Sequence, residues 1–156
     1  MSVNVRAVFL FLQIVAGVIL ASNWGTVYAE TPCASVHFVA ANESFCLEVA
    51  DTYASRETGL QSRNSLSSRG GMIFIFPENE PRVFWMKETL IELDILFLDD
   101  AGEVQSLVTR VQPGPVKLYA SAKYVIELPG GEGEAMGLWP GDKVQFPESV
   151  TRPVFK

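Results

Sequence analysis

The chain is poor in the residues that most enzyme and metal sites need. It contains one histidine, His37, and two cysteines, so a catalytic triad built on a histidine base has no second candidate. It has neither the glycine-rich fingerprint of dinucleotide-binding proteins nor a phosphate-binding loop. The acidic turn Asp99-Asp100-Ala101-Gly102 is typical of an ordinary hairpin connection rather than of a metal site. We therefore expect no metal and no cofactor.

Long apolar runs are confined to the N-terminus. Residues 7–21 are almost wholly apolar, but this run is shorter than the roughly 18 residues of a membrane-spanning helix. Arg6 precedes it, and Val27-Tyr28-Ala29 provides a site where a signal peptidase would cut. We predict that residues 1–29 are a cleaved signal peptide, with an uncleaved anchor as the alternative. Residues 30–156 are then a single β domain exported to the periplasm or the medium.

Basic residues are in the minority. The chain has 12 lysines and arginines against 18 aspartates and glutamates, a formal charge of −6. Loss of the predicted signal peptide removes Arg6 and leaves 11 basic residues against 18 acidic ones, a formal charge of −7. Such a chain repels nucleic acid and anionic membranes, so we expect neither as a partner. Membrane contact is expected only through the signal segment before cleavage.

The two cysteines lie in positions that favour pairing. Cys33 and Cys46 flank two predicted hairpin strands, Ser35–Ala40 and Phe45–Ala50, and exported chains rarely keep free thiols. A disulfide between them would close a loop of roughly 14 residues, worth about 3 kcal/mol in the chain-entropy model. The alternative is two unrelated thiols.

Short strands separated by turns dominate the rest of the chain. One short helix is predicted at Tyr53–Thr58, with Asp51 or Thr52 as its N-cap and Gly59 at its end, and a glycine-weakened helical turn fits between Gly130 and Gly137. The pattern favours a mainly β fold, either an antiparallel sandwich or a partly closed barrel, with one or two short helices. Further strands are predicted at Met72–Phe76, Arg82–Met86, Glu92–Leu98, Glu103–Val111, Ala122–Leu128 and Lys143–Phe146.

Alternation along the strands assigns the faces. Leu93, Ile95 and Phe97 share one face, which places Asp94 among apolar residues of the other face. Asp94 is thus an acid on a strand that is apolar on both sides. By the same alternation Lys123 and Glu127 share a face, and we expect them to face water or each other.

A series of short motifs follows in a characteristic order. They are Gly59-Leu60, Arg63-Asn64-Ser65-Leu66, Gly71-Met72-Ile73-Phe74, Phe84-Trp85-Met86-Lys87, Leu93-Asp94, Ile126-Glu127-Leu128-Pro129 and Gly141-Asp142. With these motifs, the chain resembles the bacterial and archaeal family called domain of unknown function 192 over about residues 47–146. The resemblance implies a compact, mostly β domain of jelly-roll-like architecture, often exported, without an established activity.

Two residues depart from the family pattern. The family usually has asparagine after the lysine of the Phe-Trp-Met-Lys motif and proline before Leu-Asp, whereas this chain has Glu88 and Glu92. Both changes add negative charge beside the predicted site.

The polar residues of the motifs form our candidate ligand site. They could bind an anionic or sugar-like ligand, with a planar arginine fork for a carboxylate and a lysine as a point charge, while Asp94 could act as a base if it is desolvated. The structural alternative is that Arg63 or Lys87 simply pairs with Asp94 and locks a loop onto the sheet. The set consists of Arg63, Lys87, Thr89, Asp94 and Glu127.

Two tryptophans are candidate aromatic contacts. Trp85 could stack on a ligand ring, but alternation puts it and Phe84 on opposite faces, so at most one is expected to line a given surface. Trp139 precedes a Pro-Gly turn and is the better candidate for an exposed contact with a partner.

These observations predict a non-catalytic binding or interaction module of the cell envelope, whose partner is a small molecule or another envelope protein. One alternative is a small hydrolase or transferase that uses Asp94 or Glu127 as acid or base and Arg63 to hold its substrate; a strongly raised carboxylate pKa in a cleft would favour it. The other is a structural assembly factor that binds through apolar surface around Trp139.

Overall fold

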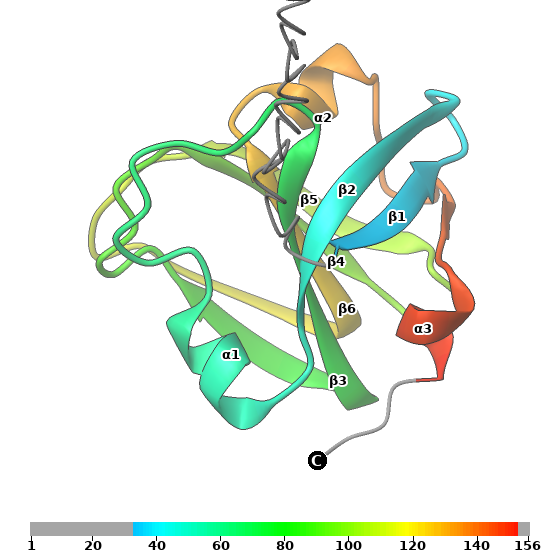
Figure 1. The fold of residues 1–156 in the computed structure, drawn as a ribbon, viewed down its shortest axis with the longest axis horizontal. Helices are drawn as coiled ribbons and strands as arrows, with labels where there is room; N and C mark the ends of the chain where they lie inside the picture. The colour runs from blue at the N-terminus through cyan, green and yellow to red at the C-terminus, as the bar shows by residue number, and fades with distance from the viewer. Residues whose placement is uncertain (1–32, 153–156) are drawn as a thin grey trace, which may run out of the picture. The chain divides into compact units, whose positions relative to one another are not determined.

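The computed structural model describes residues 33–152, and these residues form one curled sheet with three short helices (Figure 1). The predicted signal peptide lies outside the described residues. The strands are β1 (Cys33–Phe38), β2 (Glu43–Ala50), β3 (Gly70–Trp85), β4 (Leu93–Leu98), β5 (Val104–Val111), β6 (Lys117–Pro129) and β7 (Val144–Gln145). The helices are α1 (Tyr53–Thr58), α2 (Glu132–Ala135) and α3 (Glu148–Thr151). The mainly β fold is confirmed.

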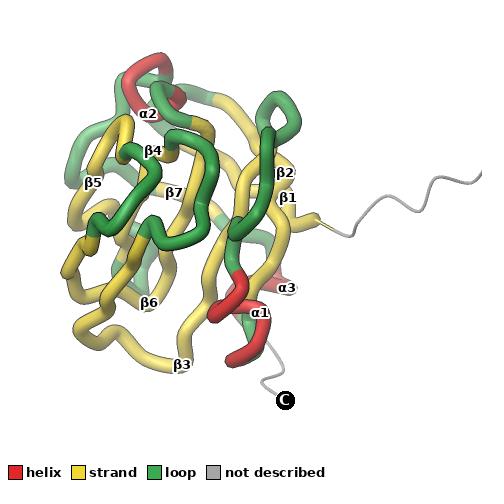
Figure 2. The backbone as a smooth tube through the Cα atoms, turned by 90° about the vertical axis from the view of Figure 1, so that its left-hand side faces the viewer, coloured by secondary structure: helices red, strands yellow, loops and turns green. Residues whose placement is uncertain are grey.

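The seven strands follow the order β5-β4-β6-β3-β2-β1-β7. All neighbouring pairs are antiparallel except β2 and β3, which are parallel and connected through α1. The two edges of the sheet approach each other through a single bridge between Glu103 and Lys143. The sheet is therefore a partly closed barrel. Figure 2 shows α2 at one end of it and α1 and α3 toward the other.

Strand β3 is longer and more strongly bent than the sequence predicts. We expected two strands separated by a turn at Pro77–Pro81, but the chain stays extended through this segment. Strands β3 and β6 are antiparallel, so the first half of β3 pairs with the end of β6 and the second half with its beginning. The register of this pairing shifts between Ile75 and Glu80. Because β2 pairs only with the first half, β6 is the sole partner of the second half.

Apolar residues fill both faces of the sheet. One cluster contains residues of all seven strands, among them Phe45, Ile73, Leu96 and Ile126. The second cluster lies on the other face, where Phe84 makes edge-to-face contacts with the rings of Phe74, Phe76 and Phe97. The predicted alternation in β4 is confirmed, since Leu93, Ile95 and Phe97 belong to the second cluster and Leu96 and Leu98 to the first.

Two local predictions are also confirmed. Helix α1 has the predicted bounds, with Thr52 as N-cap: the Ser55 N–H donates to Thr52 Oγ1 at 3.1 Å, and Gly59 ends the helix with a positive φ of 49°. A disulfide joins Cys33 and Cys46 and links β1 to β2. Within residues 33–152, no helix is long and apolar enough to cross a membrane.

Candidate functional site

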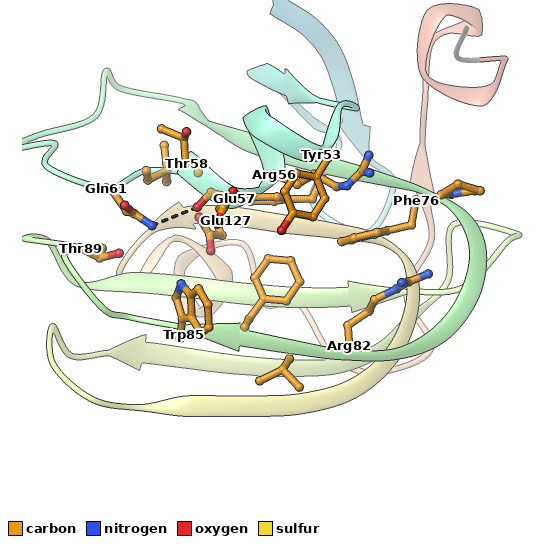
Figure 3. A pocket seen from close by; sticks show the side chains of 16 residues that line it. Tyr53, Arg56, Glu57, Thr58, Gln61, Phe76, Arg82, Trp85, Thr89 and Glu127 are labelled. Carbon is orange, nitrogen blue, oxygen red and sulfur yellow. Dashed lines mark hydrogen bonds between the residues drawn. The ribbon is translucent and has the colours of Figure 1, made fainter. Parts of the chain in front are cut away.

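A cleft lies between α1 and β3, and we call it the α1–β3 cleft (Figure 3). Its volume is about 410 Å³, which is in the range of small-molecule sites. Helix α1 and the turn after it form one wall, the two halves of β3 form the other, and Thr89 and Glu127 complete it. Its lining consists of Tyr53, Arg56, Glu57, Thr58, Gly59, Leu60, Gln61, Phe74, Phe76, Pro77, Arg82, Val83, Phe84, Trp85, Thr89 and Glu127.

Two arginines hold one end of the cleft in place. The guanidinium groups of Arg56 and Arg82 lie 5.1 and 4.1 Å from the ring centroid of Phe76. Arg56 donates to the carbonyls of Asp51 (2.6 Å) and Ile75 (3.0 Å), and Arg82 donates to those of Glu78 (2.7 Å) and Ala122 (3.3 Å). Burial, and then the charge of Arg82, lower the pKa of Arg56. Arg56 therefore connects α1 to β3, and Arg82 connects the bend of β3 to β6.

The unpaired edge of β3 borders the cleft, which corrects one prediction. Phe84 is 9% exposed and Trp85 is 47% exposed, as expected for neighbours on opposite faces. Both nevertheless line the cleft. The expectation that only one of them could line a given surface is wrong, because the cleft runs along an edge of the strand, and residues of both faces meet at an edge.

Glu127 is the buried acid of the cleft. It lies on β6 opposite Ile95 of β4 and Met72 of β3, and it is only 5% exposed. No group of the described residues forms a hydrogen bond to its carboxyl group. Burial raises its pKa from 4.5 to about 8, so the carboxyl group is mostly neutral at pH 7. The expectation that Glu127 faces water or Lys123 is wrong: Lys123 forms an ion pair with Asp100 at 3.2 Å instead.

Thr89 joins Glu127 in the cleft. It lies in the loop after β3 and is 7% exposed. Every fully buried side-chain nitrogen or oxygen in residues 33–152 has a hydrogen-bond partner. Since the Thr89 hydroxyl and the Glu127 carboxyl have no such partner there, their oxygens must reach the open space of the cleft. Thr89 and Glu127 are thus the two members of the predicted ligand set that the fold brings together.

Asp94 has a structural environment and lies outside this cleft. It is fully buried, and its carboxylate accepts three backbone N–H groups: Arg110 (2.7 Å) and Gly131 (2.9 Å) on Oδ1, and Gly133 (2.7 Å) on Oδ2. The alternative that Arg63 or Lys87 pairs with Asp94 is wrong. Backbone donors take that place because a bulge in β5 and the start of α2 both meet β4 here.

The remaining predicted cations lie elsewhere. Arg63 forms a two-pronged ion pair with Glu48 (2.5 and 2.7 Å), which raises the pKa of Arg63, in a separate hollow beside the disulfide. Lys87 is exposed and lies 3.6 Å from Glu88. Glu92, the other family departure, pairs with Arg110 at 3.2 Å, and neither glutamate lines the cleft.

Trp139 lies on the turn between α2 and β7, also away from the cleft. It is 73% exposed, and its backbone N–H donates to Asp142 Oδ2 at 2.7 Å. A protein contact through Trp139 stays a prediction.

Sequence reasoning missed the contribution of α1. Tyr53, Glu57 and Gln61 face the cleft from this helix and its following turn, but no motif marks them as site residues. None of the six residues of α1 belongs to the buried core, an observation that only the structure provides.

Comparison with known proteins assigns the class. The profile of the DUF192 family, described as an uncharacterized ACR, matches residues 36–146 of this chain. The chain belongs to this family, and the match extends the resemblance seen in the sequence into β1. No curated protein has significant similarity to the chain.

Two crystal structures are similar. One is a candidate transcription regulator from Sinorhizobium meliloti 1021, with 28% identity and a TM-score of 0.68 over 72% of this chain and 92% of that chain. The other is a protein of unknown function from Novosphingobium aromaticivorans DSM 12444, with 32% identity and a TM-score of 0.66 over 72% of this chain and 83% of that chain.

Proposed function

We propose that this protein is a non-catalytic binding module that holds a small organic molecule in the α1–β3 cleft. The observation that carries the proposal is Glu127, a buried carboxyl group with no hydrogen-bond partner among residues 33–152, which lines a cleft of about 410 Å³. Ligand sites typically combine apolar walls with a few polar groups that fix orientation. The cleft has this composition, with Phe74, Phe84 and Trp85 beside Glu127 and Thr89.

The module acts outside the cytoplasm, in the periplasm or the medium. The N-terminal pattern of Arg6, an apolar run and a cleavage site supports export. The disulfide between Cys33 and Cys46 supports an oxidising compartment, since such bonds are rare in reducing ones.

Nucleic acid is not the expected ligand. The Sinorhizobium relative is described as a candidate transcription regulator. In this chain acidic residues outnumber basic ones by 18 to 12, and phosphate backbones bind through arginine and lysine. We therefore expect a small molecule rather than DNA.

A thermal-shift screen tests the proposal. The oxidised protein, produced from the full chain, is screened against sugars, carboxylates, amines and nucleotides. A ligand at 100 times its dissociation constant should add about 2.7 kcal/mol to the free energy of unfolding. Thr89→Val and Glu127→Gln should remove the shift, whereas Trp139→Ala and Lys87→Ala, outside the cleft, should keep it. A shift lost in the outside variants and kept in the cleft variants would place the site elsewhere.

A second candidate function is a carboxylate-dependent hydrolase or transferase. The observation that favours it is the pKa of about 8 for Glu127, because a carboxylic acid that is protonated at pH 7 can donate a proton. Asp94 is not its partner acid, since three backbone N–H groups occupy that carboxylate. Turnover of a cleft ligand that Glu127→Gln abolishes while binding persists would select this candidate over the binding module.

A further inference from the structure

The two buried acids of the described chain, Glu127 and Asp94, differ in the hydrogen bonds that their carboxyl groups receive. Asp94, on β4, is fully buried and receives three backbone hydrogen bonds. Glu127, on the neighbouring strand β6, is 95% buried but receives none from the described residues. A carboxyl group that only supported the fold would be expected to have donors, as Asp94 has. Because its oxygens reach the open space of the cleft, the partner of Glu127 there is either water or a ligand that replaces it.

No cation of the cleft neutralises Glu127. The titratable groups that line the cleft are Tyr53, Arg56 and Glu57 from α1 and Arg82 from β3, while β4 places the apolar Ile95 beside it. Desolvation is the one cause that raises the pKa of Glu127, and neither arginine offsets it. Both arginines lie against Phe76 and donate to backbone carbonyls. In the loop after β3, Lys87 pairs with its neighbour Glu88.

Aromatic rings surround the same part of the cleft. Figure 3 shows the indole of Trp85 and the side chain of Glu127 directed into it, with Tyr53 on the α1 side. Phe74 and Phe84 contribute two further rings, packed edge to face at a centroid distance of 5.0 Å. Aromatic faces attract cations, and this attraction grows when water is excluded.

We propose that the ligand of the α1–β3 cleft is a small organic cation, a primary or quaternary ammonium compound, whose charge lies on Glu127 and against the ring of Trp85. The inference rests on the proposed binding function and names its ligand class. A bound cation would place a positive charge beside Glu127, where the cleft has none, and its alkyl groups would pack against the aromatic rings. An anion would instead approach two carboxyl groups, Glu57 and Glu127, in an acidic protein.

Proton linkage provides a specific signature. Binding of a cation requires the ionised form of Glu127, and with a pKa of about 8 that fraction rises from about a tenth near pH 7 to about nine tenths near pH 9. Tetramethylammonium has no proton to lose in this range, so its affinity should rise about tenfold between these two pH values. A neutral ligand that accepts a hydrogen bond from protonated Glu127 should show the opposite trend.

The experiment is an NMR titration of the oxidised protein, followed through the Trp85 indole N–H at both pH values. The probes are tetramethylammonium and butylammonium chloride, each with a neutral counterpart of similar shape, tert-butanol and 1-pentanol. We expect both cations to bind more tightly than their counterparts and tetramethylammonium to show the tenfold rise. Glu127→Gln should abolish the preference and the pH dependence. Glu88→Gln, the matched control at an exposed glutamate outside the cleft, should keep both.

Each other outcome counts against the inference. Neutral probes that bind in the cleft as well as the cations, with an affinity that is flat or falls toward pH 9, would overturn the cation assignment and leave the proposed binding function standing. Silence from all four probes at tens of millimolar, together with silence in the wider thermal-shift screen, would overturn both. An NMR spectrum of Glu127→Gln that resembles the wild-type spectrum in the absence of probes would show that the variant is folded.

Discussion

At the residue scale, the structure contains three buried polar or charged side chains among residues 33–152: Thr89, Asp94 and Glu127. Asp94 and Glu127 differ in the hydrogen-bond donors around their carboxyl groups. Three backbone N–H groups donate hydrogen bonds to the Asp94 carboxyl group, whereas Glu127 faces apolar side chains and a cleft. Burial without donors favours the neutral acid, and burial with donors suits the carboxylate. Glu127 should therefore make the stability of the fold depend on pH.

Glu127→Gln should flatten that dependence. Between pH 4.5 and about 8 the carboxyl group is ionised in the unfolded chain but protonated in the fold, so the folded state binds more protons and the free energy of unfolding falls as pH rises. The contribution is fully present below pH 4.5 and lost above about pH 8. The shift corresponds to a loss on the order of 5 kcal/mol, which the glutamine variant should lack. Urea unfolding of both proteins across this range measures the difference.

An exposed acid of the same cleft provides the control for that prediction. Glu57→Gln should leave the pH dependence of the wild-type protein unchanged, because this side chain is exposed on α1. Parallel curves for wild type and Glu127→Gln would show that Glu127 ionises in the fold as it does in the unfolded chain, and the description of a neutral buried acid would be wrong.

At the scale of elements, Asp94 joins three parts of the chain. From β4 it accepts N–H groups of Arg110 in β5 and of Gly131 and Gly133 at the start of α2. Arg110 has a positive φ of 52° in the bulged part of β5, a conformation that this hydrogen bond helps to hold. Helix α2 has no side-chain cap of its own at Gly131. The Asp94 side chain on β4 thus caps the N-terminus of α2 in place of a residue next to the helix.

Asp94→Ala should lower the free energy of unfolding by about 3 to 5 kcal/mol, because it leaves buried N–H groups without partners. The matched control is Asp99→Ala. Asp99 Oδ1 also accepts two backbone N–H groups, from Ala101 and Glu103, but in a turn where water can replace it, so we expect a loss of about 1 kcal/mol. Chemical denaturation measures both. Equal losses would mean that burial of Asp94 does not decide its contribution.

At the scale of the whole molecule, the disulfide links β1 to β2, and β1 lies next to the edge strand β7, near which the two edges of the barrel meet. The two edges meet at the Glu103–Lys143 bridge and a few neighbouring backbone hydrogen bonds, and the disulfide adds a covalent constraint on the N-terminal strands. Replacement of both Cys33 and Cys46 by serine should lower the free energy of unfolding by about 3 kcal/mol, mainly because the unfolded chain gains conformational entropy without the cross-link. Thermal unfolding with and without reductant measures this.

The double serine variant is also its own control, since reductant should not change its melting temperature. Reduced wild-type protein should melt where the variant does. An oxidised wild-type protein no more stable than the variant would remove the structural role of the disulfide and weaken the argument for an oxidising compartment.

Much of the fold could be predicted because its signals are local. Helix α1 was predicted with its bounds, since Thr52 and Gly59 are a strong cap and a strong stop. The faces of β4 followed from alternation alone. The bend of β3 was not predicted, because the Pro77–Pro81 segment has the composition of a turn, whereas the structure pairs β3 with β6 before and after this segment and places two arginines against Phe76.

The sequence identified several polar residues of the candidate site but not how the fold arranges them. The family motifs singled out Thr89, Asp94 and Glu127, which are the three buried polar residues of the described chain. They also grouped Asp94 with Arg63 and Lys87, which the fold separates. Alternation put Glu127 and Lys123 on one face, but could not show that α1 and the second half of β3 cover the position of Glu127 and leave that of Lys123 open.

The sequence by itself determined the class of fold, the disulfide pair, the helix α1, the alternation of the strands and the residues that carry polar groups into the interior. These properties depend on neighbours within a few positions along the chain or on strong residue preferences. The tertiary structure decided which buried acid receives hydrogen bonds from the described residues and which receives none. That outcome depends on donors 16 to 39 residues away for Asp94, and on walls from α1 and β3 for Glu127. Hydrogen bonding and desolvation act through space, so only the folded chain sets them.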